Sequence, residues 1–198
     1  MEQKTKNSNK AFTLLEITVV ISIIILLSTI FIANYRGGEK QFALKRSVYK
    51  LAQDLRRAEE MAMSSQMTPD SFEPGVFPKG GYGISFMKDS KSYVLFADCD
   101  GDNKYDEGSG ASSCKEATEI TPYPEKLEEI PFEQGIYIKE LFKDSSLVDF
   151  LSIIFFPPDP IITINSDPAI NSATISLTFD GVSQKTVTIN KAGLIDIE

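Results

Sequence analysis

The feature that most limits what this chain can fold into is an apolar run from Phe12 to Ala33, FTLLEITVVISIIILLSTIFIA, whose only formal charge is Glu16. As a helix rising about 1.5 Å per residue, the run would be roughly 33 Å long. That length exceeds the hydrocarbon thickness of a bilayer, which is about 30 Å. We therefore expect a membrane-spanning helix. A carboxylate inside such a helix is costly and usually functional, so we expect Glu16 to have a cationic partner.

A short basic segment precedes the apolar run. It carries Lys4, Lys6 and Lys10 against the single acid Glu2, and it has no apolar residue between Met1 and Ala11. A secretory signal would place its small-residue cleavage site after the apolar run, whereas here the small residue comes before it. The start of the chain is therefore not an ordinary cleaved signal peptide.

The basic leader followed by Ala11-Phe12-Thr13-Leu14-Leu15-Glu16 resembles the processing site of type IV prepilins and pseudopilins. The resemblance implies that a prepilin peptidase cleaves before Phe12 and methylates the new amine, leaving the apolar helix attached. It also implies that Glu16 serves assembly by neutralising the Phe12 amine of a neighbouring subunit. Ala11 departs from the glycine usual in the family, which implies less efficient cleavage. The alternative is a signal anchor in which Glu16 is incidental.

Composition narrows the function classes. The net charge is −8, and an acidic body argues against nucleic acid as the main partner. The chain has no histidine, which removes the commonest general base and zinc ligand. It also has no glycine-rich phosphate loop and no nucleophile elbow. We therefore do not expect an enzyme.

Two cysteines, Cys99 and Cys114, are the only thiols in the chain. Outside the cytoplasm they would form one disulfide that closes a small loop and contributes roughly 3 kcal/mol. The alternative is a pair of free buried thiols in a reducing compartment. The polar loop between the cysteines favours the disulfide and an exported domain.

Four segments are expected along the chain: a basic leader (1–11), a transmembrane and polymerisation helix (12–35), an amphipathic helix (36–66) and a β-rich globular head (67–198). The amphipathic helix follows from apolar residues spaced alternately four and three apart, which would bury one face. These residues are Leu44, Val48, Leu51, Leu55, Ala58 and Ala62. The fold class expected is therefore α+β and pilin-like, with a long N-terminal helix packed on an antiparallel sheet.

The head changes to the two-residue period of strands. Polar turns separate the runs, and Asp180-Gly181 between two alternating runs is the best hairpin signal. The strands expected are 82–87, 92–97, 136–141, 147–156, 161–164, 173–179, 185–189 and 194–197. The segments 51–58 and 190–196 resemble those of H-type pseudopilins and minor pilins.

An acidic loop begins at Asp98 and reads DCDGDNKYDEG. Carboxylates at its first, third, fifth and ninth positions, Asp98, Asp100, Asp102 and Asp106, follow the ligand spacing of calcium loops. Asn103 replaces the usual glycine, and Ser109 replaces the bidentate glutamate at the twelfth position. The alternative is an Asp/Gly-rich surface turn that binds no ion. If Ca²⁺ binds, its affinity should be weak.

These observations and the resemblance predict a structural subunit of a type IV pilus or of a type II secretion-like fibre. It would be inserted by a single pass in the cytoplasmic membrane with its head outside, then cleaved before Phe12 and assembled through its helix. Its partners would be the prepilin peptidase, other pilin or pseudopilin subunits and the membrane. The alternative function is a monomeric, membrane-anchored, extracytoplasmic ligand-binding protein.

Overall fold

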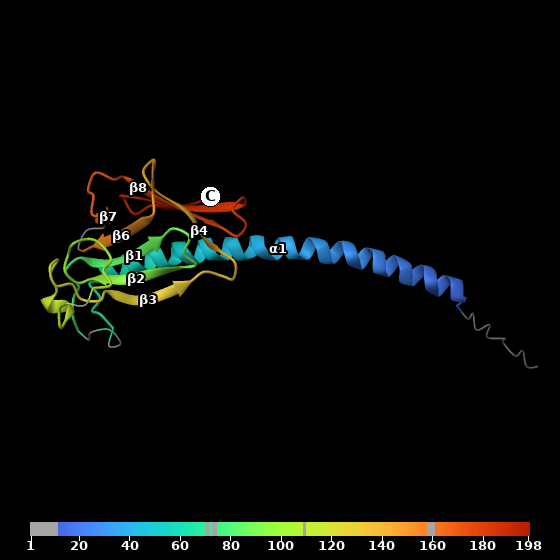
Figure 1. Ribbon diagram of the computed structural model, residues 1–198, viewed down its shortest axis with the longest axis horizontal. Coiled ribbons are helices and arrows are strands. Elements are labelled where there is room, and N and C mark those ends of the chain that lie inside the picture. Colours follow the sequence, from blue (N-terminus) through green and yellow to red (C-terminus); the bar gives the residue numbers. More distant parts are fainter. Residues whose placement is uncertain (1–11, 70–71, 73–74, 109, 158–160) are drawn as a thin grey trace, which may run out of the picture. The chain divides into compact units, whose positions relative to one another are not determined.

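The computed structural model describes residues 12–69, 72, 75–108, 110–157 and 161–198 (Figure 1). The chain divides into two compact units, Met1–Glu39 and Lys40–Glu198. Helix α1, Leu14–Met63, contributes to both. The expected leader, with Ala11, lies outside the described residues, and so does Ser109 in the acidic loop.

Both ends of α1 are set by local chemistry. Thr13 caps the start, because its hydroxyl and its carbonyl both accept the amide N–H of Glu16, at 3.2 and 3.1 Å. At the other end Ser65 adopts φ 49°, in the left-handed region that ends many helices. The amide of Gln66 then closes the last turn on the Met61 carbonyl at 3.0 Å.

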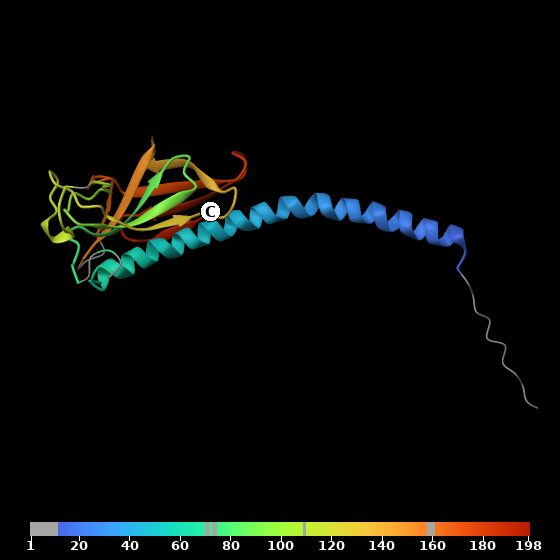
Figure 2. The same ribbon diagram turned by 60° about the horizontal axis from the view of Figure 1, so that its bottom comes forward.

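Unit Lys40–Glu198 contains two five-stranded antiparallel sheets (Figures 1 and 2). The first has the order β3-β2-β1-β6-β7, and the second has the order β10-β9-β8-β4-β5. The strands of the first sheet are β1 (Gly81–Met87), β2 (Ser92–Asp98), β3 (Lys126–Pro131), β6 (Phe150–Phe156) and β7 (Ile161–Ile164). Those of the second are β4 (Tyr137–Lys143), β5 (Ser146–Val148), β8 (Ser172–Thr178), β9 (Gln184–Asn190) and β10 (Ile195–Ile197). A short 3₁₀ helix, Cys114–Glu116, lies in the loop between β2 and β3.

Two of the connections between strands are local and match the expected hairpins. Strands β1 and β2 pair antiparallel with Tyr82 opposite Ala97. Strands β8 and β9 pair with Thr178 opposite Gln184, and their turn contains Gly181 at φ 77°, a conformation that favours glycine. The pairs β1–β6 and β4–β8 instead join strands that are far apart in the sequence.

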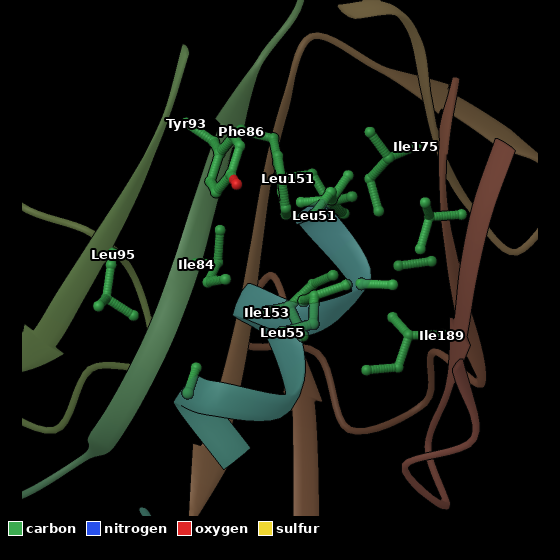
Figure 3. Close-up of a cluster of buried hydrophobic side chains, with 14 of the residues drawn as sticks. Leu51, Leu55, Ile84, Phe86, Tyr93, Leu95, Leu151, Ile153, Ile175 and Ile189 are labelled. Atoms are coloured by element: carbon green, nitrogen blue, oxygen red, sulfur yellow. The ribbon is translucent and has the colours of Figure 1, made fainter. Parts of the chain in front are cut away.

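The core of this unit lies between its helix and its two sheets. Leu51 and Leu55 of α1 are fully buried and lie among side chains of both sheets, such as Ile153 of the first and Ile175 and Ile189 of the second (Figure 3). The predicted apolar stripe is thus the face that the helix buries. Every member of it, from Leu44 to Ala62, is in the core.

The expected fold class, α+β with a pilin-like helix on an antiparallel sheet, is wrong. The described residues form two antiparallel sheets of five strands each, not one sheet under a helix. The physical reason is that strands β4, β5, β8, β9 and β10 pair only with one another. They therefore form a second sheet, which also packs against the helix. Alternation along a strand predicts which face is buried but not which strand is its neighbour.

The expectation of a membrane-spanning helix over 12–35 is also wrong. Among the described residues, no helix combines the length and the apolar character needed to cross a membrane. The described apolar part of α1 covers residues 14–30, or roughly 26 Å at 1.5 Å per residue, less than the hydrocarbon core. The single-pass location in the cytoplasmic membrane is overturned by the same finding.

Candidate functional site

The apolar run in the first unit presents its side chains outward. Between residues 14 and 30, twelve large apolar side chains are exposed, with Leu14 the most exposed at 82%. They surround the helix on every side, whereas an ordinary surface helix has one apolar stripe. Such a surface on a single helix indicates contact with something outside this unit.

Glu16 is the single charge within this surface. It lines a shallow hollow with Phe12, Ile17, Val20 and Ile21. Its amide is satisfied by Thr13, but within the described residues its carboxylate has neither a hydrogen-bond partner nor an ionic one. The structure therefore places Phe12 and Glu16 on the same apolar surface and leaves the carboxylate available to a partner. It does not describe Ala11.

In the second unit, Cys99 and Cys114 form the expected disulfide, with an S–S distance of 2.00 Å and a sequence separation of 15 residues. The bond is buried together with Ala117 in a small apolar cluster. It holds the end of strand β2 against the 3₁₀ helix. The acidic loop that starts at Asp98 is therefore anchored at its base.

The acidic loop is built from turns in which carboxylates accept backbone N–H groups. The two oxygens of Asp98 accept the amides of Gly101 at 2.6 Å and Asn103 at 2.9 Å. Asp100 accepts the amide of Asp102 at 3.1 Å in the same manner. Gly101 and Asn103 adopt φ of 83° and 62°, as tight turns of Gly and Asn do.

Three of the four proposed calcium ligands converge. One carboxylate oxygen each from Asp98, Asp100 and Asp102 lies within 4.8 Å of the others. Asp106 does not belong to this cluster. The Oδ2 atom of Asp100 is buried and has no hydrogen-bond partner among the described residues, so it is an acceptor that a cation could satisfy.

A buried glutamate directly before strand β3 supports this loop, and no sequence pattern predicted it. Glu125 is 1% exposed, and its carboxylate oxygens accept the amides of Cys99 at 2.8 Å and Asp106 at 3.0 Å. Asp106 is thus held through its backbone next to Glu125 rather than in the carboxylate cluster. A single acid after Pro124 carries no local pattern that would have identified it.

Burial dominates the electrostatics of this loop. It raises the pKa of Asp98 to about 7, against the lowering by the two backbone hydrogen bonds. It raises the pKa of Glu125 to about 9 for the same reason, with neighbouring Asp98 and Asp100 adding to the effect. The pKa of Asp102 is raised as well, first by burial. An added cation would favour the ionised forms and reverse these shifts.

The chemistry of this donor set suits a hard cation. Ca²⁺ takes six to eight oxygen ligands and tolerates irregular geometry. The described loop offers three carboxylates and several backbone carbonyls, although those of Asp102 and Asn103 already accept the hydroxyl of Ser166 at 2.9 and 2.7 Å. With fewer carboxylates than a high-affinity loop, such a site would be weak.

Comparisons with known proteins identify no relative: no family model, no curated protein and no solved structure matches this chain.

Proposed function

We propose that this chain is a structural subunit of a fibre of the type IV pilus or type II secretion kind, processed before Phe12 and assembled through its N-terminal helix. The observation that carries the proposal is the exposed apolar surface of residues 14–30, with Glu16 as its single charge. The prepilin-like sequence around Phe12 supports it independently.

The free energy of assembly would come from that surface. Burying one Leu, Ile or Val side chain contributes about 1.5–3 kcal/mol. Twelve such side chains are exposed between residues 14 and 30. Helices of neighbouring subunits can cover one another on several sides because the surface is apolar all round. A subunit would therefore gain more from many neighbours than from one.

Glu16 would set the position of one helix along the next in this assembly. A carboxylate enclosed by apolar helices is strongly destabilising unless a cation accompanies it. Cleavage before Phe12 creates a new α-amine four positions before Glu16 along the chain. The amine of one subunit beside the Glu16 carboxylate of the next neutralises both charges, and it fixes how far one helix is shifted along the other.

Mass spectrometry of the purified protein tests the processing step. A chain that begins at N-methylated Phe12 supports the fibre subunit. An intact Met1 contradicts it and favours the rival function, a monomeric ligand-binding protein. The variant Ala11→Gly restores the glycine usual in prepilins and should raise the processed fraction. The variant Ala11→Asp should lower it, because a charged side chain replaces the small residue at the cut.

A calcium-binding role for the acidic loop is a second proposal, and a separate observation favours it. The carboxylates of Asp98, Asp100 and Asp102 converge, and one buried Asp100 oxygen has no partner among the described residues. Bound Ca²⁺ would fix a loop already anchored by the disulfide, so its role would be structural. Thermal melts in calcium and in chelator test it.

A further inference from the structure

The most exposed large apolar side chain of the second unit lies in a turn that the proposed function does not use. Ile120 is 91% exposed. It belongs to the four-residue turn 118–121, which we call the Ile120 turn. Two acids, Glu116 and Glu119, accompany it, and both are exposed.

Backbone hydrogen bonds close the Ile120 turn on both sides. The amide of Thr121 donates to the Thr118 carbonyl at 3.0 Å, and the amide of Thr118 donates to the Thr121 carbonyl at 3.2 Å. The two threonine hydroxyls are 2.7 Å apart. Just before the turn, the Lys79 ammonium donates to the Ala117 carbonyl at 2.6 Å. Ile120 is thus held outward at little entropic cost, and such preorganisation favours binding.

A second exposed surface, with aromatic rings and positive instead of negative charges, lies on the part of α1 that belongs to the same unit. Phe42, Lys45, Tyr49, Gln53 and Arg56 are spaced to share one side of the helix and are all exposed. We call them the aromatic helix face. Its two aromatic rings are 62% and 59% exposed. Lys45 and Arg56 form no ion pair within the described residues.

The two surfaces are complementary but do not meet in one copy. The loop between β2 and β3, which contains the Ile120 turn, lies at one end of unit Lys40–Glu198, and α1 enters the unit at the other end (Figure 2). A contact between them must therefore join two copies. It would pair different surfaces, and an interface of this kind that does not close into a ring produces an open filament.

We propose that the Ile120 turn of one subunit docks on the aromatic helix face of a second copy of this chain. Ile120 packs against Phe42 and Tyr49, while Glu116 and Glu119 face Lys45 and Arg56. An apolar anchor surrounded by charge pairs is the usual layout of a specific interface. This inference rests on the proposed function, to which it adds a contact between heads beyond the packing of the apolar helices.

Cross-linking of the full-length protein in sheared fibres tests the contact. A photoreactive amino acid replaces Ile120, or in the matched control Val182, which is 83% exposed in the turn between β8 and β9. Fibres are grown from a mixture of isotopically labelled and unlabelled copies. We expect cross-links from position 120 to residues 42–56 of another copy and none from position 182. Cross-links from position 120 to other regions only, or the same pattern from both positions, would overturn the inference.

Substitutions provide the energetic test. We expect Ile120→Asp to lower fibre recovery by about fivefold or more, and Val182→Asp to leave it within about twofold. Glu119→Lys should also lower recovery, and Lys45→Glu in the same chain should restore part of it. If the wild type forms fibres and the two aspartate variants are recovered in equal amounts, this inference is wrong but the proposed function is not contradicted. A wild type that forms no fibres removes both.

Discussion

The two units of this chain use one helix in opposite ways. In Lys40–Glu198, buried and exposed residues alternate along α1, and Leu51 and Leu55 are fully covered by the two sheets of the same unit. Between residues 14 and 30 the apolar side chains are exposed on all sides. The second unit therefore has its partners within itself, whereas the first must find them elsewhere. A helix with apolar side chains on all of its sides, rather than in one stripe, is typical of a helix that other elements surround.

The largest difference in unfolding free energy is expected between two leucine-to-alanine substitutions, one in each part of α1. Leu55→Ala removes a fully buried side chain and should lower the free energy of unfolding by about 3 kcal/mol, within the 2–5 kcal/mol typical of such cavities. Leu26→Ala removes an exposed one and should change it by less than about 0.5 kcal/mol. Urea titration of both full-length variants measures this. Equal destabilisation would mean that residue 26 belongs to the same core.

The disulfide should contribute nearly as much to the free energy of unfolding, and it should stabilise only the second unit. Replacing Cys99 and Cys114 by serine, or reducing the bond, should cost about 3 kcal/mol for a closed loop of this length. Melting with and without reductant measures the loss. Alkylation of the folded protein without reductant should label neither cysteine. Quantitative labelling of both would contradict the account of the acidic loop.

The dependence on pH should come from buried carboxyls of the second unit. The folded pKa of Asp98 is about 7 and that of Glu125 about 9, both above their ordinary values. The folded state then binds protons that the unfolded state releases, so stability is greatest below about pH 4 for these groups and falls as the pH rises toward 9. Glu125→Gln keeps this side chain neutral and should flatten the decline above pH 7.

Urea titrations in chelator at intervals from pH 5 to 9 measure this dependence. The exposed acid Glu119 provides the matched control, because Glu119→Gln should leave the profile unchanged. Stability that rises steadily over this range would mean that the folded state stabilises both ionised carboxylates, and it would contradict the effect assigned to burial.

The smallest effect is expected from calcium. For a weak site with a dissociation constant of about 0.1–1 mM, 5 mM Ca²⁺ should add about 1–2 kcal/mol. In a unit of this size that raises the melting temperature by roughly 2–8 °C. Asp100→Asn should abolish the shift, while the exposed Asp196→Asn should retain it. An unchanged melting temperature of the wild type in Ca²⁺ would mean that the loop is a surface turn that binds no ion.

Sequence patterns predicted the parts of this molecule that depend on neighbours along the chain. The spacing from Leu44 to Ala62 predicted the buried helix face, and Asp180-Gly181 predicted a hairpin. The pairings β1–β6 and β4–β8 could not be predicted, because partners distant in sequence share no local signal. Strand β3 was missed since its residues, KLEEIP, are largely charged and it lies at a sheet edge.

In the candidate sites, too, contacts between residues near in sequence were predicted and contacts between distant residues were not. The acidic spacing brought Asp98, Asp100 and Asp102 together because these residues share one turn. Asp106 was misplaced because Glu125, from beyond the disulfide, holds its backbone. The membrane-spanning helix was inferred from the length and the apolar character of the run Phe12 to Ala33. Apolar character shows that a surface needs a partner, but it does not say which partner.

The central claim is that the first unit exists to pack against other copies, and Glu16 tests it most directly. Glu16→Leu makes the surface more apolar but removes the partner of the Phe12 amine. We predict that recovery of sheared fibres, or co-assembly with the major subunit, falls at least about tenfold, as expected for a buried charge left unpaired. The processed fraction should stay at the wild-type level. Glu60→Leu, the same change at an exposed position of α1 in the second unit, should assemble normally. Normal assembly of Glu16→Leu would contradict the account.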